Sequence, residues 1–108
     1  MRGTGLVVLV TCPSQASARR LAAHLIRSRV AACVNVIGQV ESLFWWKGKS
    51  ESAREYLLMI KTSRSRFEAL RRTVVAHHPY DVPEVIALPI AAGHAPYLAW
   101  IQRSVRAA

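Results

Sequence analysis

Two long extended segments, Cys33 to Trp46 and Glu51 to Thr62, dominate the middle of this 108-residue chain. The residues between them, 47–49, read Lys-Gly-Lys, which is typical of a hairpin turn. Each arm holds about a dozen residues, so at about 3.3 Å per residue the hairpin reaches about 40 Å. A helix of about 15 residues covers only about 22 Å. We therefore predict a hairpin longer than the helices of one chain can cover, with Gly38 as a β-bulge in its first arm.

The tip of this hairpin carries Leu43, Phe44, Trp45 and Trp46. Successive side chains of a strand point to opposite faces, so an isolated hairpin leaves at least one of the two indoles in water. Exposed apolar groups of this size indicate a contact surface. Two interpretations follow. Either the hairpin curls over its own core, or the chain forms an oligomer in which each hairpin pairs with a neighbour's sheet and the contacts close as a ring.

Two amphipathic helices are predicted outside the hairpin. The first runs from about Ser14, a fair N-cap, to Arg29, and its apolar residues recur at helical spacing on one face. The second starts after Ser63, which is expected to cap it, and stops before Pro79. Each helix follows a strand pattern, so each is expected to return the chain to the same sheet.

Two further strands and a terminal helix complete the pattern. Apolar runs predict strands over Leu6–Cys12 and Glu84–Ile90, and a short last helix carries Tyr97 and Trp100, which are expected to pack against a neighbouring subunit. The order β-α-β-β-α-β is that of the ferredoxin-like, split βαβ motif. We therefore predict an α+β sandwich, one domain over residues 1–108, with a four-stranded antiparallel sheet and both long helices on one face.

Composition excludes several other classes of protein. An apolar fraction of 52% with 19% charged residues is typical of a globular domain. The longest apolar run near the N-terminus, Leu6 to Val10, is shorter than a secretion signal or a membrane helix requires, so we expect a cytoplasmic protein with no membrane partner.

Cys12 and Cys33 fit no zinc or redox spacing and are expected to be free thiols. The net charge of +9 invites a nucleic-acid hypothesis, but basic residues occur in every predicted element, so no specific nucleic-acid binding is expected.

Several motifs together resemble the CutA divalent-cation tolerance family. The similarity runs from about residue 6 to residue 105 and rests on VVLVTCPS, RVAACVNVIGQVESLFWWKGK, LLMIKT, HPYDVPEVIALPI and YLAW. The resemblance implies a ferredoxin-like subunit in a tight homotrimer, which agrees with the ring inferred from the hairpin. It also implies a role in tolerance of divalent cations, copper above all, in the bacterial cytoplasm. Trimers of this shape are similar to the PII signalling proteins, which bind small effectors between subunits.

The stretch that contains His78 and Glu84 is the main candidate for a functional site. Copper accepts imidazole nitrogen and thiolate sulfur, so His78, Glu84 and Cys12 are the predicted metal ligands. Some members of the family that the chain resembles have a proposed copper-binding cysteine two residues before Cys12. Val10 stands there instead, and Cys12 shares its face of the strand. His77 and His78 diverge by about 100° at a helix end, so at most one of them binds a given ion.

The same stretch also has a purely structural interpretation. Pro79 and Pro83 restrict the backbone, the hydroxyl of Tyr80 can anchor the corner, and Asp81 can form a local turn. Glu84 can pair with an arginine across a subunit contact. In this interpretation the stretch is a corner of the chain and not a ligand site.

A third hypothesis is a PII-like effector-binding or scaffolding trimer. Its cleft between subunits would be lined by Lys61, Tyr80 and Glu84, with Lys61 either contacting an anionic ligand or extending to solvent. No catalytic motif is present in the sequence, so we expect a protein that is not an enzyme. Copper or another divalent cation is expected to bind weakly, and no cofactor is expected to be required for folding.

Overall fold

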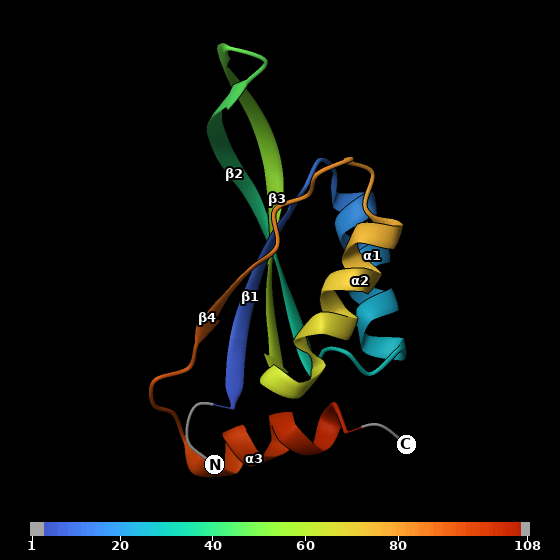
Figure 1. Ribbon diagram of the computed structural model, residues 1–108, viewed down its shortest axis with the longest axis vertical. Coiled ribbons are helices and arrows are strands. Elements are labelled where there is room, and N and C mark those ends of the chain that lie inside the picture. The colour runs from blue at the N-terminus through green and yellow to red at the C-terminus, as the bar shows by residue number, and fades with distance from the viewer. Residues whose placement is uncertain (1–3, 107–108) are drawn as a thin grey trace.

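The computed structural model describes residues 4–106 and forms one antiparallel sheet, with two helices packed on one of its faces and the last helix at one end of it (Figure 1). In chain order the elements are β1 (Gly5–Cys12), α1 (Gln15–Arg27), β2 (Cys33–Trp46), β3 (Lys49–Ser63), a 3-10 turn (Arg64–Arg66), α2 (Phe67–His77), β4 (Ile86–Pro89) and α3 (Ala95–Ser104). The predicted α+β class and the predicted order of elements are thus confirmed.

Strand β1 lies inside the sheet, whose order is β2-β3-β1-β4. It pairs with β3 along its whole length and with β4 over four residues, and both pairings are antiparallel. Every second residue of β1 is buried toward the helices: Leu6, Val8, Val10 and Cys12. This period of two is expected when helices cover one face of an antiparallel sheet. Cys12 is therefore the last core residue of β1, at the edge where the helix layer ends.

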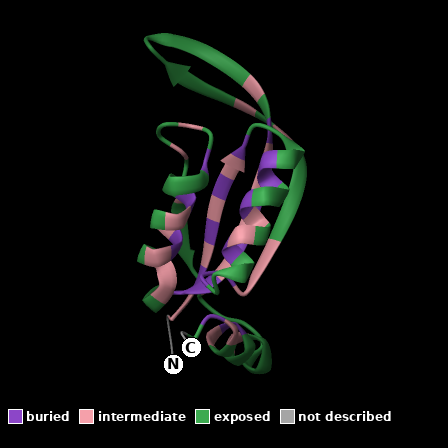
Figure 2. Cartoon of the chain, turned by 90° about the vertical axis from the view of Figure 1, so that its right-hand side faces the viewer, coloured by how far each residue is buried: buried purple, intermediate pink, exposed green. Residues whose placement is uncertain are grey.

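Helices α1 and α2 lie side by side on that face, and their buried residues point toward the sheet (Figure 2). Helix α1 starts as predicted, because the hydroxyl of Ser14 accepts a 3.1 Å hydrogen bond from the backbone N–H of Ser17. The expected cap of the second helix is wrong. Ser63 hydrogen-bonds the hydroxyl of Ser65 instead, and a 3-10 turn delays the start of α2 to Phe67. Competition between local side-chain bonds and helix capping accounts for the shift.

The hairpin of β2 and β3 is as long as predicted and dominates the longest dimension of the chain, 44 Å. Its turn consists of two residues, Lys47 and Gly48, both with positive φ, which suits the twist of the flanking strands. The pairing register shifts between Ile37 and Val40, where the sequence predicted a bulge at Gly38. The end of the hairpin projects beyond the helices, and its outer half is exposed (Figure 2).

The exposure of the hairpin tip in the described chain rules out one of its two interpretations, and the oligomer stays a prediction. Leu43 and Trp45 are each 78% exposed, and Trp46 is 55% exposed. A hairpin curled over its own core would bury these side chains, so that interpretation is wrong.

The last strand also differs from prediction, since β4 covers only Ile86–Pro89 and all four of its residues are exposed. Glu84 belongs to the preceding corner and not to the strand.

Candidate functional site

The corner between α2 and β4 brings five reactive side chains from four parts of the chain into one region. Cys12 stands at the end of β1, His78 follows the last residue of α2, and Tyr80 and Glu84 lie in the corner itself. Glu55 comes from β3, which pairs with the end of β1. We call this group the corner cluster. The helix must end here because Pro79 cannot continue it and disfavours helical geometry at the residue before it.

His78 is buried, and both of its ring nitrogens are already engaged. Its Nε2 lies 2.7 Å from the backbone carbonyl oxygen of Thr11. A carbonyl only accepts, so Nε2 carries the proton and donates. The other nitrogen, Nδ1, accepts a 3.0 Å hydrogen bond from the backbone N–H of Tyr80. The imidazole is therefore the neutral Nε2–H tautomer, and in this arrangement it has no free lone pair to offer to a metal ion.

Cys12 is fully buried, and its sulfur lies 3.7 Å from Nε2 of His78. Burial raises the pKa of the thiol to about 11, and the nearby carboxylate of Glu55 acts in the same direction. The side chain is thus a neutral thiol at physiological pH. Because metals bind the thiolate, an ion at this position must first displace a tightly held proton.

Tyr80 and Glu55 form the central hydrogen bond of the corner cluster. The hydroxyl of Tyr80 donates to Oε2 of Glu55 over 2.7 Å, and only 6% of Glu55 is exposed. Burial, followed by this hydrogen bond and by the charge of Glu55, raises the pKa of Tyr80 to about 12. The tyrosine therefore acts as a fixed donor that satisfies a buried carboxylate. It confirms the prediction that the hydroxyl of Tyr80 anchors the corner.

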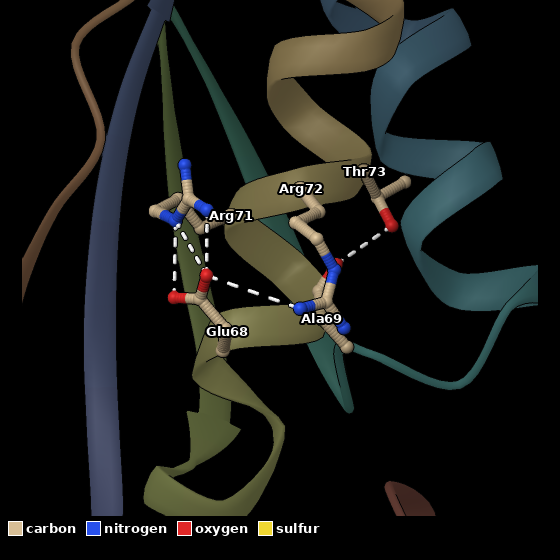
Figure 3. A network of polar contacts seen from close by, with 5 residues as sticks. All are labelled: Glu68, Ala69, Arg71, Arg72 and Thr73. Carbon is tan, nitrogen blue, oxygen red and sulfur yellow. Dashed lines mark hydrogen bonds and ion pairs between the residues drawn. The ribbon is translucent and has the colours of Figure 1, made fainter.

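Glu84 makes the corner cluster acidic. Its pKa is raised, first by burial and then by the neighbouring charge of Glu55. Two carboxylates thus lie near each other on a chain whose net charge is +9. Ion pairs join Glu68 to Arg71 and Arg72 on the exposed side of α2 (Figure 3). Glu84 has no arginine partner within residues 4–106, so its expected partner across a subunit contact stays a prediction.

The predicted metal ligands are only partly brought together. Cys12 and His78 are neighbours, as expected. Glu84, however, does not complete a set with them, because no three histidine, cysteine or acidic side chains in the described part of the chain are placed to hold one ion. The donor set of one chain therefore does not fit a bound metal as it stands. The two nitrogens of His78 are used, the thiol of Cys12 is protonated, and a third ligand is missing from residues 4–106.

The residues predicted to bind an effector also lie apart from one another within one chain. Lys61 contacts Oδ1 of Asn35 and lies 4.0 Å from the sulfur of Cys33. It is six residues along β3 from Glu55, the partner of Tyr80, which is about 20 Å in an extended strand. Lys61 and Tyr80 therefore cannot line the same site in a single subunit. A cleft that combines them between subunits stays a prediction.

The residues predicted to form subunit contacts are exposed. Trp45 and Trp46 lie at the hairpin tip, where Nζ of Lys47 sits 5.9 Å from the ring of Trp46. Tyr97 and Trp100 stack on α3 with ring centroids 5.4 Å apart. Both rings remain more than a third exposed, so each offers an apolar surface without a cover from residues 4–106.

Glu55 is the member of the corner cluster that the sequence did not identify as a site residue. The buried positions of β3 near it, Leu58, Ile60 and Thr62, are even-numbered, so strand alternation alone would place Glu55 on the opposite face. Its hydrogen bond with Tyr80 shows that the corner lies against this part of the sheet. The β-bulge in β2 opposite is the one local signal that the regular alternation fails here.

Fold and site together define a small α+β protein with a long, exposed apolar hairpin and an acidic corner that holds a thiol and an imidazole. Comparison with known sequences identifies the family of this protein. The family model of the CutA1 divalent ion tolerance protein matches residues 6–104, and the chain belongs to that family.

Relatives of this family are similar over most of the described chain. The chloroplastic protein CutA 1 of Oryza sativa subsp. japonica is 48% identical over 94% of this chain and 57% of the relative. The divalent-cation tolerance protein CutA of Thermus thermophilus is 44% identical over 91% of this chain and 95% of the relative. The crystal structure of CutA1 from Oryza sativa superposes with a TM-score of 0.94 at 46% identity, covering 99% and 98% of the two chains. This chain spans a little over half the length of the plant relatives.

The name of the family model and those of the Thermus thermophilus relative and structure refer to tolerance of divalent cations or ions. The names of other relatives refer to different compartments, since plant relatives are called chloroplastic and a relative from Archaeoglobus fulgidus is called periplasmic. In the described part of this chain, none of the helices is long and apolar enough to cross a membrane.

Proposed function

We propose that this chain is a ferredoxin-like subunit of a cytoplasmic homotrimer that takes part in tolerance of divalent cations, with copper as its main ion. It acts by binding ions weakly and not by catalysing a reaction. The observation that carries this proposal is the corner cluster. Two carboxylates, Glu55 and Glu84, are gathered beside the thiol of Cys12 and the imidazole of His78, on a chain that is otherwise strongly basic.

The state of the ligands explains why binding is weak. A thiol with a pKa of about 11 must lose its proton before it binds a metal, and that step costs free energy at neutral pH. His78 must also give up either its bond to Thr11 or its bond to Tyr80. The nearby carboxylates partly offset these costs, because they favour a cation at the same place. Affinity is therefore expected to rise as the pH rises.

The exposed hairpin supports the trimer. Leu43, Trp45 and Trp46 form an apolar tip that one chain does not cover, and β2 lies at the edge of the sheet with unpaired backbone groups. A neighbouring copy that pairs with this edge would satisfy both features. Tyr97 and Trp100 would be covered by the same assembly. Head-to-tail contacts of this kind close as a ring when the rotation allows it. The resemblance to the CutA family implies that the ring has three copies.

Calorimetric titration of the metal-free protein tests the metal role. The oligomeric state is first verified by mass, and Cu(II), then Cu(I) under reducing conditions, is added to wild type and to Cys12→Ser. A cysteine-to-serine change keeps the size of the side chain, so the trimer is expected to persist. Weak binding at one site per subunit that is lost in Cys12→Ser would support the proposal. An intact trimer that binds neither ion would contradict it.

The PII-like alternative has less support. The three residues that would line its cleft, Lys61, Tyr80 and Glu84, do not meet within one chain, and Tyr80 is already bonded to Glu55. We therefore keep metal handling as the proposed function.

A further inference from the structure

A second pair of histidines lies outside the corner cluster. The rings of His24, on α1, and His77, in the last turn of α2, have centroids 4.0 Å apart and planes inclined at 35°. The two residues are 53 positions apart in the chain, and only the packing of α1 against α2 brings them together. Both side chains reach the surface: His77 is exposed and His24 is half-buried.

His24 and His77 each have a ring nitrogen with a free lone pair, in contrast to His78. Nδ1 of His77 lies 3.0 Å from the backbone carbonyl oxygen of Thr73, so it carries the proton and leaves Nε2 as a free acceptor. A histidine oriented by an Nδ1–H bond to a carbonyl is the usual state of an imidazole that binds a metal through its other nitrogen. The ring of His24 has no hydrogen-bond partner within residues 4–106, so either of its nitrogens is available.

The distance between the rings suits chelation of one ion. Two nitrogens that bind the same ion at about 2.0–2.1 Å lie about 3.3–3.4 Å apart when the geometry is tetrahedral. The ring centroids are 4.0 Å apart, so the two imidazoles are close enough for both to reach one ion after their side chains rotate and the rings separate.

The pair opens into a surface pocket of about 550 Å³. One side of α1 along its length, the two residues before it, and His77 and Pro79 at the end of α2 line it, and no acidic residue is among them. Arg20 and Arg27 also line it, and neither has an ion-pair partner in the described chain. Both guanidiniums are exposed, so water and salt screen their repulsion of a cation. They also favour an anionic group, such as a carboxylate or chloride, at the positions of the ion that the protein leaves open.

We propose that His24 and His77 form a separate surface site for one divalent transition-metal ion. The ion is of the class that prefers imidazole, such as Cu(II), Ni(II) or Zn(II), and it is held by Nε2 of His77 and one nitrogen of His24. Water and small anions complete its coordination. The site does not rest on the proposed role of the corner cluster, because it shares no ligand with that cluster.

Titration with Ni(II) alone tests this inference on the full chain in its native oligomeric state. Ni(II) is chosen because the imidazole nitrogen suits it and because it does not oxidise the free thiols. The wild type is compared with His24→Ala, His77→Ala and, as a matched control, His94→Ala, another exposed histidine that lies outside the pocket. All three changes are on the surface, and circular dichroism confirms that the variants fold.

One Ni(II) per chain is expected. Each of the two pocket variants should weaken binding by at least about tenfold, as loss of a ligand does. His94→Ala should leave binding unchanged. In a parallel sample with Cu(II), electron paramagnetic resonance should show coupling to two imidazole nitrogens in wild type and to one in His24→Ala.

Other outcomes separate this inference from the proposed function. Binding that survives both pocket variants but disappears in Cys12→Ser would overturn the His24–His77 site and leave the corner cluster as the metal site. Binding that disappears in the pocket variants but survives Cys12→Ser would support this site. Ni(II) that binds nowhere, or equally to all variants, would overturn it, while the copper titration would still decide the proposed function on its own.

Discussion

The hydroxyl of Tyr80 donates a 2.7 Å hydrogen bond to the buried carboxylate of Glu55 and joins the corner after α2 to the middle of β3. Twenty-five residues separate the two positions in the chain. The bond satisfies a carboxylate that has almost no access to water. It therefore stabilises the placement of the whole corner, including the imidazole of His78 and the thiol of Cys12.

Tyr80→Phe is expected to destabilise the protein by about 1–3 kcal/mol, because it leaves a buried carboxylate without its donor. Urea unfolding at a fixed protein concentration measures the change. Glu55→Gln provides the control. Its amide oxygen can still accept the hydrogen bond from Tyr80, so this variant should lose less stability than Tyr80→Phe. A Tyr80→Phe variant as stable as wild type would show that water replaces the hydroxyl and that the bond does not hold the corner.

Cys12 is expected to resist alkylation at pH 7 to 9. Its raised pKa of about 11 keeps the thiol protonated there, and full burial excludes the reagent. Cys33 is partly exposed, so iodoacetamide should modify one cysteine per chain rapidly. Mass spectrometry of peptides identifies which one. Rapid labelling of Cys12 in the folded protein at pH 8 would contradict both its burial and its raised pKa.

The free energy of unfolding is expected to fall as the pH rises from about 9 to about 12. Folding raises the pKa of Cys12 from 9.0 to about 11 and that of Tyr80 from 10.0 to about 12, so the folded state holds these protons over a range in which the unfolded state has released them. A state that binds more protons loses stability relative to the other as the pH increases. Denaturant unfolding at several pH values measures this slope, and it should become shallower in Cys12→Ala. An equal slope in that variant would refute the contribution of the thiol.

Glu84→Gln is expected to stabilise the protein at pH 7 and to weaken copper binding. The raised pKa of Glu84 means that its charged form is disfavoured beside Glu55, so neutralising it relieves repulsion. The gain should disappear at acidic pH, where Glu84 of the wild type takes up a proton. Thermal unfolding at pH 7 and at acidic pH measures the first effect, and copper titration measures the second. Lower stability at pH 7 would indicate an attractive partner for Glu84, such as an arginine of another subunit.

Trp45→Ser is expected to weaken the oligomer without unfolding the subunit. The indole is 78% exposed in the single chain, so its removal costs the monomer little, whereas a contact between subunits would lose a large buried surface. Sedimentation velocity over a range of concentrations measures the change. Ile26→Ser, on the exposed side of α1, serves as the control. If Trp45→Ser sediments like wild type at every concentration, the tip does not form the contact.

Much of the fold was predictable from the chain because its signals are local. The apolar run Leu6–Cys12 identified β1, helical spacing from Ser14 identified α1, and the length of the segments on either side of Gly48 predicted a long hairpin. The break at Gly38 was also readable, since a glycine inside a strand often marks a bulge. Where local signals competed, as at Ser63, the prediction failed by a few residues.

The chemistry of the site depended on contacts between distant segments. The sequence identified Cys12, His78 and Tyr80 as candidates, but it gave no sign that both nitrogens of His78 are occupied or that Glu55 lies beside them. His24 and His77 looked unrelated until α1 and α2 packed together. The reason is physical. Spacing along the chain determines which face of a strand or helix a residue occupies, whereas burial, pKa and ligand geometry depend on which other segments fold against that face. The sequence by itself therefore determined the helices and strands of this protein. Only tertiary packing decided the burial, protonation and hydrogen bonding of its reactive side chains.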